Sequence, residues 1–431
     1  MIAVQSRPAV ISEAMPKAVV FTLVLFLLGW VTFGFSLVDA GRYSIPLLYV
    51  AALPFCLRIT SRSVLFLALP ILSTMFSIAV AALDGFTKMS ILSQAALQLL
   101  AIGVAAGAAS IDWPRWISGF TKAMVSIAVP IVVFGGYQMI ARAIRLPFAF
   151  LPVTNQQVYA AGGLQRGWEK EHITRASSLF VEPSDFGYFS LWLFVLGLST
   201  AKGGWRNLAL ALALGGMLFS QSLSAVLGAA ILLLVYFFTN PVNLKLVGQI
   251  VVLLLALGVG IALLQPLLPD AFSRFSDRIQ QAVSLDGRAD SGRVDHLPAC
   301  WEIFKEAPVW GHGLSTVVAA DDTGSDVTSV TYALILMERG VVGAAFFLVP
   351  WLLIGMRSYR LPRADPARTP ALLLTALQLY SFSTTSLAYF PPFWLSLGIT
   401  ASLIFRTHLL PERFAPPKRL ELGTRRMSTI A

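Results

Sequence analysis

Two long polar segments carry the side chains best suited to chemistry in this chain. The first covers residues 143–183 and the second covers residues 269–329, and apolar runs flank both. The second segment holds nearly half of the 22 acidic residues and two of the four histidines, His296 and His312. Because polar groups are costly to bury without partners, we expect the two segments to fold at a surface, each forming half of one site.

Both segments contain arginines that could bind phosphate groups. A guanidinium group stays charged, and its planar fork binds phosphate oxygens in pairs. For Arg175, which lies close to an apolar run, the alternative is an anchor whose charge reaches the lipid headgroups. The arginines of interest are Arg166, Arg175, Arg274, Arg278, Arg288 and Arg293.

Local patterns around these arginines predict helices and a turn. Glu182-Pro183-Ser184 is typical of a helix start, with a carboxylate near the positive end of the helix dipole and proline at the entry. Residues Asp290–Phe304 predict an amphipathic surface helix, because apolar residues recur there at helical spacing. Gly311-His312-Gly313 allows the backbone to approach a ligand closely, or is only a turn.

The composition is that of an integral membrane protein. Of the 431 residues, 56% are hydrophobic and only 13% are charged, whereas soluble domains carry about 25% charged residues. A helix needs about 20 mainly apolar residues to cross a bilayer, and runs of that kind predict an all-α polytopic protein with about 12 transmembrane helices and two large extracytoplasmic loops. The two cysteines, Cys56 and Cys300, lack metal-ligand spacing.

Each expected span follows from an apolar run with polar or turn-forming boundaries. Asn207–Ser220 is the least distinct, because only Ser220-Gln221-Ser222 separates it from the next run, and the alternative is one long tilted helix. The expected spans are Ala18–Phe35, Tyr43–Leu57, Ser63–Leu83, Ser90–Ser110, Gly119–Ala141, Ser184–Ala201, Asn207–Ser220, Ser222–Thr239, Leu246–Leu268, Leu336–Met356, Pro370–Tyr389 and Pro391–His408.

The basic residues set the expected orientation. With both termini in the cytoplasm, the cytoplasmic segments hold more than half of the 32 Lys and Arg residues, whereas the short outside loops hold only Arg42 and Lys88. This asymmetry accounts for most of the net charge of +10 without a nucleic-acid partner. It divides the chain into N-terminal spans (1–142), a first large outside loop (143–183), central spans (184–268), a second large outside loop with a surface helix (269–329), C-terminal spans (330–410) and a basic cytoplasmic tail (411–431).

Three motifs resemble those of a known superfamily. The order Arg-x-x-Ser-x-Phe-x-Glu-Pro-Ser, from Arg175 to Ser184, resembles Wzy-type polysaccharide polymerases. The string Gly-Arg, Trp, Phe, Pro and Gly-His-Gly, from Gly292 to Gly313, resembles the wider O-antigen ligase and polymerase superfamily, as does the Glu-x-Gly-x-x-Gly that begins at Glu338.

The resemblance implies a glycosyltransferase of the bacterial inner membrane. Such an enzyme joins undecaprenyl-diphosphate-linked repeat units at the periplasmic face, for O-antigen, capsule or exopolysaccharide. It implies no cofactor and no metal. The implied partners are an undecaprenyl-diphosphate-linked glycan, membrane lipid and a chain-length regulator protein.

The resemblance also gives the site residues their expected roles. Arg175 and Arg293 are expected to bind the leaving diphosphate, and Glu182 either to act as general base for the acceptor hydroxyl or to orient Arg175. Further substrate contacts are expected from Arg166, Arg278, Arg288 and His312.

Two departures from the ligases bear on the choice of activity. Ligases of this superfamily usually carry a histidine where this chain has Ser329, and Ser-Arg where it has Ser222-Leu223. The first departure favours a polymerase over a ligase that transfers glycan to lipid A core. A transporter or flippase of lipid-linked sugars is the remaining alternative. It is disfavoured because ionisable residues are nearly absent from the span centres and no half of the chain repeats the other.

Overall fold

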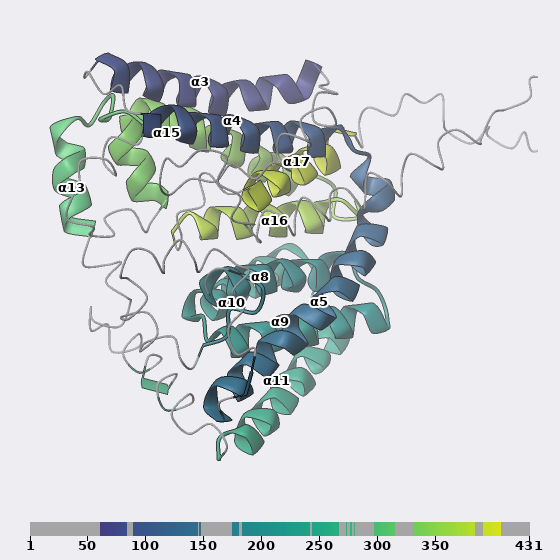
Figure 1. Ribbon diagram of the computed structural model, residues 1–431. Coiled ribbons are helices and arrows are strands. Elements are labelled where there is room, and N and C mark those ends of the chain that lie inside the picture. The colour runs from purple at the N-terminus through teal and green to yellow at the C-terminus, as the bar shows by residue number, and fades with distance from the viewer. Residues whose placement is uncertain are drawn as a thin grey trace, which may run out of the picture.

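The computed structural model describes residues 61–83, 89–144, 146–147, 175–180, 183–241, 244–266, 273, 276–277, 280, 297–314, 331–383 and 391–406. Within these ranges the regular structure is entirely helical, so the predicted all-α fold is confirmed for this part of the chain (Figure 1). The helices are α3 (Ser61–Leu83), α4 (Met89–Ser110), α5 (Trp113–Ile144), α8 (Pro183–Ser199), α9 (Gly204–Ser220), α10 (Leu223–Thr239), α11 (Leu244–Leu264), α13 (Leu297–Glu306), α15 (Thr331–Arg360), α16 (Arg368–Ser381) and α17 (Pro391–Arg406).

Helices long and apolar enough to cross a bilayer identify a membrane protein. Among the described residues these are Trp113–Ala141 in α5, Leu244–Ala262 in α11 and Thr331–Arg360, which is α15. Shorter apolar stretches lie in α3, α10 and α17. The expected total of about 12 spans stays a prediction, because several of these helices are short for a bilayer and residues 1–60 lie outside the described ranges.

The expected turn at Ser220-Gln221-Ser222 does separate two helices, α9 and α10. Gln221 adopts a left-handed conformation with φ of 48°, which ends α9. Ser222 caps α10, because its hydroxyl oxygen accepts a hydrogen bond from the backbone nitrogen of Ala225 (3.3 Å). The alternative of one long helix through residues 207–239 is therefore wrong.

Helix α8 lies at the centre of the packing, and most of its side chains are buried. Small residues let its neighbour α9 approach closely: Gly197 lies against Leu210, and Ser190 lies against Gly216. These two contacts make α9 antiparallel to α8. A similar close approach joins α4 to α17, where the Cα of Gly398 faces the backbone of Ala105.

The predicted span Pro370–Tyr389 is too long as a helix, because α16 ends at Ser381 and residues 382–383 form a turn. Phe382 instead packs into an aromatic cluster, with its ring 4.8 Å from that of Phe393 and 5.8 Å from that of Trp351. This packing depends on side chains from α15 and α17, so the length of the apolar run does not report it. Residues 384–390 lie outside the described ranges.

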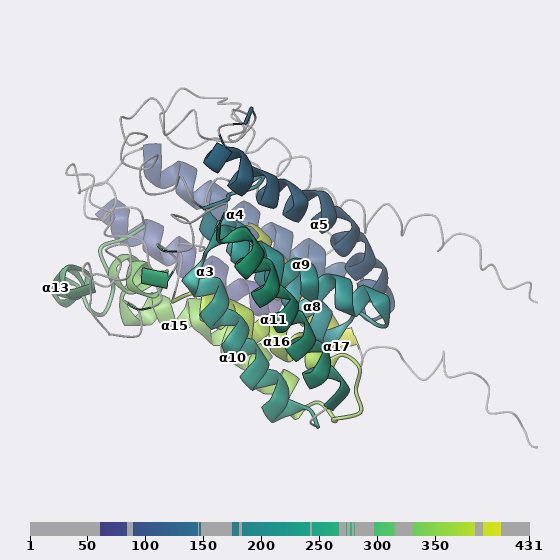
Figure 2. The ribbon, with the colours of Figure 1, turned by 90° about the horizontal axis from the view of Figure 1, so that it is seen from below.

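Several helix ends meet at one end of the bundle. The hydroxyl of Tyr380, at the end of α16, donates a hydrogen bond to the backbone oxygen of Ser224 at the start of α10. The backbone nitrogen of Tyr332, at the start of α15, donates to the backbone oxygen of Phe382 (3.2 Å). Figure 1 and Figure 2 both show α13 beside α15 at an outer edge of the bundle. The described ends of both long polar segments therefore join the bundle on the same side.

The opposite end carries basic side chains. There the guanidinium of Arg368, at the start of α16, donates to the backbone oxygen of Thr239 at the end of α10 (3.0 Å). The basic residues that the sequence analysis assigned to one side of the membrane thus lie at one end of the described bundle. Exposed basic residues at this end include Arg115, Lys202, Lys245, Arg357, Arg360 and Arg363.

Candidate functional site

Arg175 is held at the end of the bundle by the turn between α9 and α10. Its Nε donates to the backbone oxygen of Ser220 (3.1 Å), and the backbone nitrogen of the next residue, Ala176, donates to the backbone oxygen of Phe219 (2.9 Å). The side chain is partly buried. These two bonds fix the point at which the first polar segment reaches the helices, so Arg175 has a defined position beside α8.

A pair of hydrogen bonds from Gln138 of α5 holds the residues that follow Arg175. The side-chain amide of Gln138 donates to the backbone oxygen of Ser178 (3.1 Å), and its oxygen accepts from the Ser178 backbone nitrogen (2.7 Å). Ser178 has a positive φ of 53°, which few non-glycine residues adopt. Gln138 is a buried polar residue that the sequence did not single out, because its partner lies 40 positions away.

Helix α8 begins at Pro183, as the sequence predicted. Gly187, in its second turn, lies against Ser222, so the start of α8 also contacts the α9–α10 turn. Ser222 precedes Leu223, which stands where the ligases usually carry arginine, and here Ser222 caps α10. Glu182 itself lies outside the described residues, so its role stays a prediction.

The predicted surface helix in the second polar segment is present as α13, over Leu297–Glu306. Its buried side places Cys300 against Met337 of α15. Leu297 and Trp301 are exposed. A helix is confirmed here and extends two residues past the predicted end, whereas the buried face is that of Cys300 and not that of Leu297 and Trp301. Residues 290–296 lie outside the described ranges.

The segment after α13 crosses α15 at a break in that helix. Gly340 has φ of 57° and ψ of −169°, which are not helical values. In an unbroken helix the backbone nitrogen of Val341 would pair with the backbone oxygen of Met337. Here Val341 donates to the backbone oxygen of Pro308 (2.9 Å), and Met337 accepts from the backbone nitrogen of His312 (2.9 Å).

The next helical pair is exchanged in the same way. The backbone nitrogen of Val342 donates to the backbone oxygen of Val309 (3.3 Å), and the backbone oxygen of Glu338 accepts from the backbone nitrogen of Gly313 (2.9 Å). Each helical bond lost at the break is thus replaced by two bonds to residues 308–313. The Gly311-His312-Gly313 segment is therefore irregular backbone that crosses α15 and pairs with the backbone groups left open at the break.

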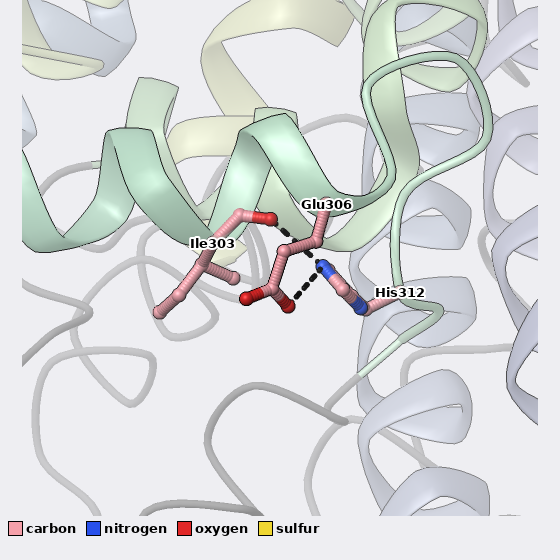
Figure 3. A network of polar contacts seen from close by, with 3 residues as sticks. All are labelled: Ile303, Glu306 and His312. Carbon is pink, nitrogen blue, oxygen red and sulfur yellow. Dashed lines mark hydrogen bonds and ion pairs between the residues drawn. The ribbon is translucent and has the colours of Figure 1, made fainter.

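The His312 side chain holds the end of α13 (Figure 3). Its Nε2 lies 2.8 Å from the backbone oxygen of Ile303 and 3.9 Å from a carboxylate oxygen of Glu306. A carbonyl oxygen can only accept, so Nε2 carries the proton and donates. This bond gives His312 a structural role at the C-terminal end of α13, and its expected contact with substrate stays a prediction.

The sequence reasoning missed Arg339, whose side chain is fully buried beside the break in α15. Its guanidinium donates to the hydroxyl of Ser73 on α3 (2.8 Å) and to the side-chain oxygen of Gln98 on α4 (2.6 Å), and it lies 4.9 Å from the ring centre of Phe347. Glu338, the adjacent acidic residue, is also buried. The available signal was an arginine inside an apolar run, where ionisable residues are rare and functional.

The remaining predicted site residues lie outside the described part of the chain. Their grouping stays a prediction, as does the site's lack of a metal. Among the residues that the structure does describe, no cluster of three or more His, Cys, Asp and Glu side chains could hold a metal ion. The site residues outside the described ranges are Arg166, Glu182, Arg278, Arg288 and Arg293.

Comparison with known proteins finds a similarity over part of the chain. Residues 208–348 match a family model described as O-antigen ligase, whereas no curated protein matches the chain. The matched region begins in α9, contains α10, α11 and α13, and ends in α15 beyond the crossing at Gly340. This region of the chain is therefore similar to the O-antigen ligase family.

Proposed function

We propose that this protein is a polysaccharide polymerase that joins undecaprenyl-diphosphate-linked repeat units at the periplasmic face of a bacterial inner membrane. The match of residues 208–348 to the O-antigen ligase family model supports a ligase-type or polymerase-type glycosyltransferase. Both termini are proposed to lie in the cytoplasm, which puts the end of the bundle with Arg175 and α13 outside. A chain-length regulator is a proposed protein partner.

The observation that carries the proposal is the position of Arg175. Its bond to Ser220 sets a cationic side chain at the end of the bundle where α13 and the His312 segment also lie. A diphosphate leaving group needs positive charge, and guanidinium groups bind phosphate oxygens through charge-assisted hydrogen bonds. Both polar segments can therefore act on one lipid-linked substrate at this end.

The proposed transfer exchanges one bond for another at the sugar. The bond between the anomeric carbon of the growing chain and its diphosphate oxygen breaks, and the diphosphate leaves with the electron pair. The same carbon bonds to the acceptor hydroxyl oxygen of a new repeat unit, whose proton passes to a base. Arg175 and Arg293 stabilise the leaving diphosphate, and Glu182 either accepts the proton or orients Arg175.

A ligase is the second candidate, because the matching family model is described as O-antigen ligase. It would transfer finished glycan to lipid A core. Ser329 stands where ligases usually carry histidine. A serine hydroxyl cannot take up a proton near neutral pH as imidazole can, and this difference favours the polymerase.

A deletion strain separates the two activities. Without a polymerase, single repeat units should accumulate on the lipid carrier, or on the core where a separate ligase acts. Without a ligase, long chains should accumulate on the carrier, and that result would overturn the proposal. The purified protein in liposomes should elongate lipid-linked repeat units without any core acceptor, whereas dependence on lipid A core would select the ligase.

A further inference from the structure

Arg339 is a buried charge at the point where α3, α4, α15 and the segment after α13 meet. No part of its side chain is exposed, and its guanidinium reaches α3 through Ser73 and α4 through Gln98. The ring of Phe347, eight residues further along α15, lies under the guanidinium. A charge is costly to bury unless hydrogen bonds satisfy it. These contacts therefore define one arrangement of α3, α4 and α15 around the break.

The break that Arg339 adjoins carries the second polar segment. Ser73 also donates to the backbone oxygen of Gly343 (2.8 Å), and Ser77, one turn along α3, donates to the backbone oxygen of Glu338 (3.1 Å). The Glu338 oxygen accepts the bond from Gly313 as well. The position of the crossing segment thus depends on how α3 and α15 are held together at Arg339.

We infer that Arg339 is a positioning residue that locks the break in α15 and thereby keeps the Gly311–Gly313 segment, His312 and α13 in place at the end of the bundle. Arg339 acts through the backbone bonds of Met337 and Glu338, the two residues before it in the chain. The link from this position to glycan transfer rests on the proposed function, whereas the lock itself does not.

Lysine in place of Arg339 should keep the charge and lose the lock. Its single ammonium group cannot present the planar fork that reaches Ser73 and Gln98 together, and it cannot stack its head on Phe347 in the same way. Arg368 supplies a matched control. It is also buried, its Nη1 also donates a hydrogen bond, and it also lies over an aromatic ring, that of Tyr359, but at the opposite end of the bundle.

Cys300 reports the docking of α13 on α15, because it is buried against Met337. The test uses the full-length protein with Cys56→Ser, in which Cys300 is the remaining thiol, purified in detergent and treated with a maleimide. Arg339→Lys should raise the labelling rate of Cys300 by at least about tenfold, as expected for the loss of one charge-assisted hydrogen bond. Arg368→Lys should leave the rate unchanged.

Two results would overturn the lock: an unchanged rate in Arg339→Lys, or an equal increase in Arg368→Lys, which would indicate general loosening. If Arg339→Lys fails to fold, Gln98→Leu tests the same lock by removing one of its two bonds, and should also raise the rate. Elongation of lipid-linked repeat units should fall in Arg339→Lys and not in Arg368→Lys. Normal elongation together with increased labelling in Arg339→Lys would overturn the link to glycan transfer. Absence of elongation in the unmodified protein would contradict the proposed function and would leave the labelling comparison intact.

Discussion

Gly311 and Gly340 lie backbone against backbone where the segment after α13 crosses α15. A Cβ atom on Gly311 would collide with the backbone nitrogens of Arg339 and Gly340, and one on Gly340 would collide with the backbone of Val309. Both glycines also have positive φ, of 73° and 57°. Two motifs that are separate in the sequence, Gly-His-Gly and Glu-x-Gly-x-x-Gly, are therefore the two sides of one contact.

Alanine at either glycine should destabilise the protein. Gly311→Ala and Gly340→Ala should each cost at least about 2 kcal/mol, because a side chain at positive φ is strained and its Cβ meets backbone that cannot move aside. The melting temperature in detergent measures the effect. Gly119→Ala is the control, since nothing lies within 4 Å of a Cβ at that helical position. Equal melting temperatures for Gly311→Ala and Gly119→Ala would contradict the crossing.

Arg175 should be needed for polymer formation. Arg175→Ala should lower the elongation rate by roughly 10- to 100-fold, because each charge-assisted hydrogen bond to the diphosphate is worth about 1.5–3 kcal/mol. Arg175→Lys should recover part of the rate. The measurement is elongation of lipid-linked repeat units by purified protein.

Arg206→Ala provides a matched control for that series. Arg206 also donates from Nε to a backbone oxygen, that of Ala201 (3.2 Å), and is also partly buried, but it lies at the other end of α9. Loss of elongation in both alanine variants, or in neither, would show that the two arginines are equivalent anchors.

Cys300 should react slowly and with a steep dependence on pH. Burial raises the pKa of its thiol above the ordinary value, so less thiolate is present near neutral pH than for an exposed cysteine. The folded state holds this proton more tightly than the unfolded state. Its contribution to stability is therefore complete below the ordinary thiol pKa and is lost as the pH rises through the raised value.

Maleimide labelling of the Cys56→Ser protein from about pH 7 to pH 10 should show a rate that continues to rise above pH 8.5. A rate equal to that of the unfolded protein would show that the thiol is exposed.

The two ends of the bundle should lie on opposite sides of the membrane. Glu302 of α13 and Lys202, between α8 and α9, are both exposed and lie at opposite ends. In a background of Cys56→Ser and Cys300→Ser, an impermeant thiol reagent should label Glu302→Cys in cells with a permeabilised outer membrane. It should label Lys202→Cys only after the inner membrane is broken. The reverse pattern would put the candidate site in the cytoplasm.

The sequence by itself determined most helix positions. The predicted runs Ser63–Leu83 and Ser90–Ser110 correspond to α3 and α4 within two residues. Apolar length predicts such helices well, because a helix in lipid must satisfy its own backbone groups wherever its partners lie. The surface helix at Leu297–Glu306 was also predictable, since its alternation of buried and exposed side chains is local.

Only the tertiary structure decided which residues complete one another. Gln98 lies 241 positions from Arg339 in the sequence. The backbone nitrogen of His312 donates to the backbone oxygen of Met337, which is available as an acceptor only because α15 breaks at Gly340. Residue type and periodicity show that a helix face is apolar or polar, but they do not name the helix it meets. A buried polar group finds its partner through the packing of whole helices, so the lock around Arg339 is a property of the assembled bundle.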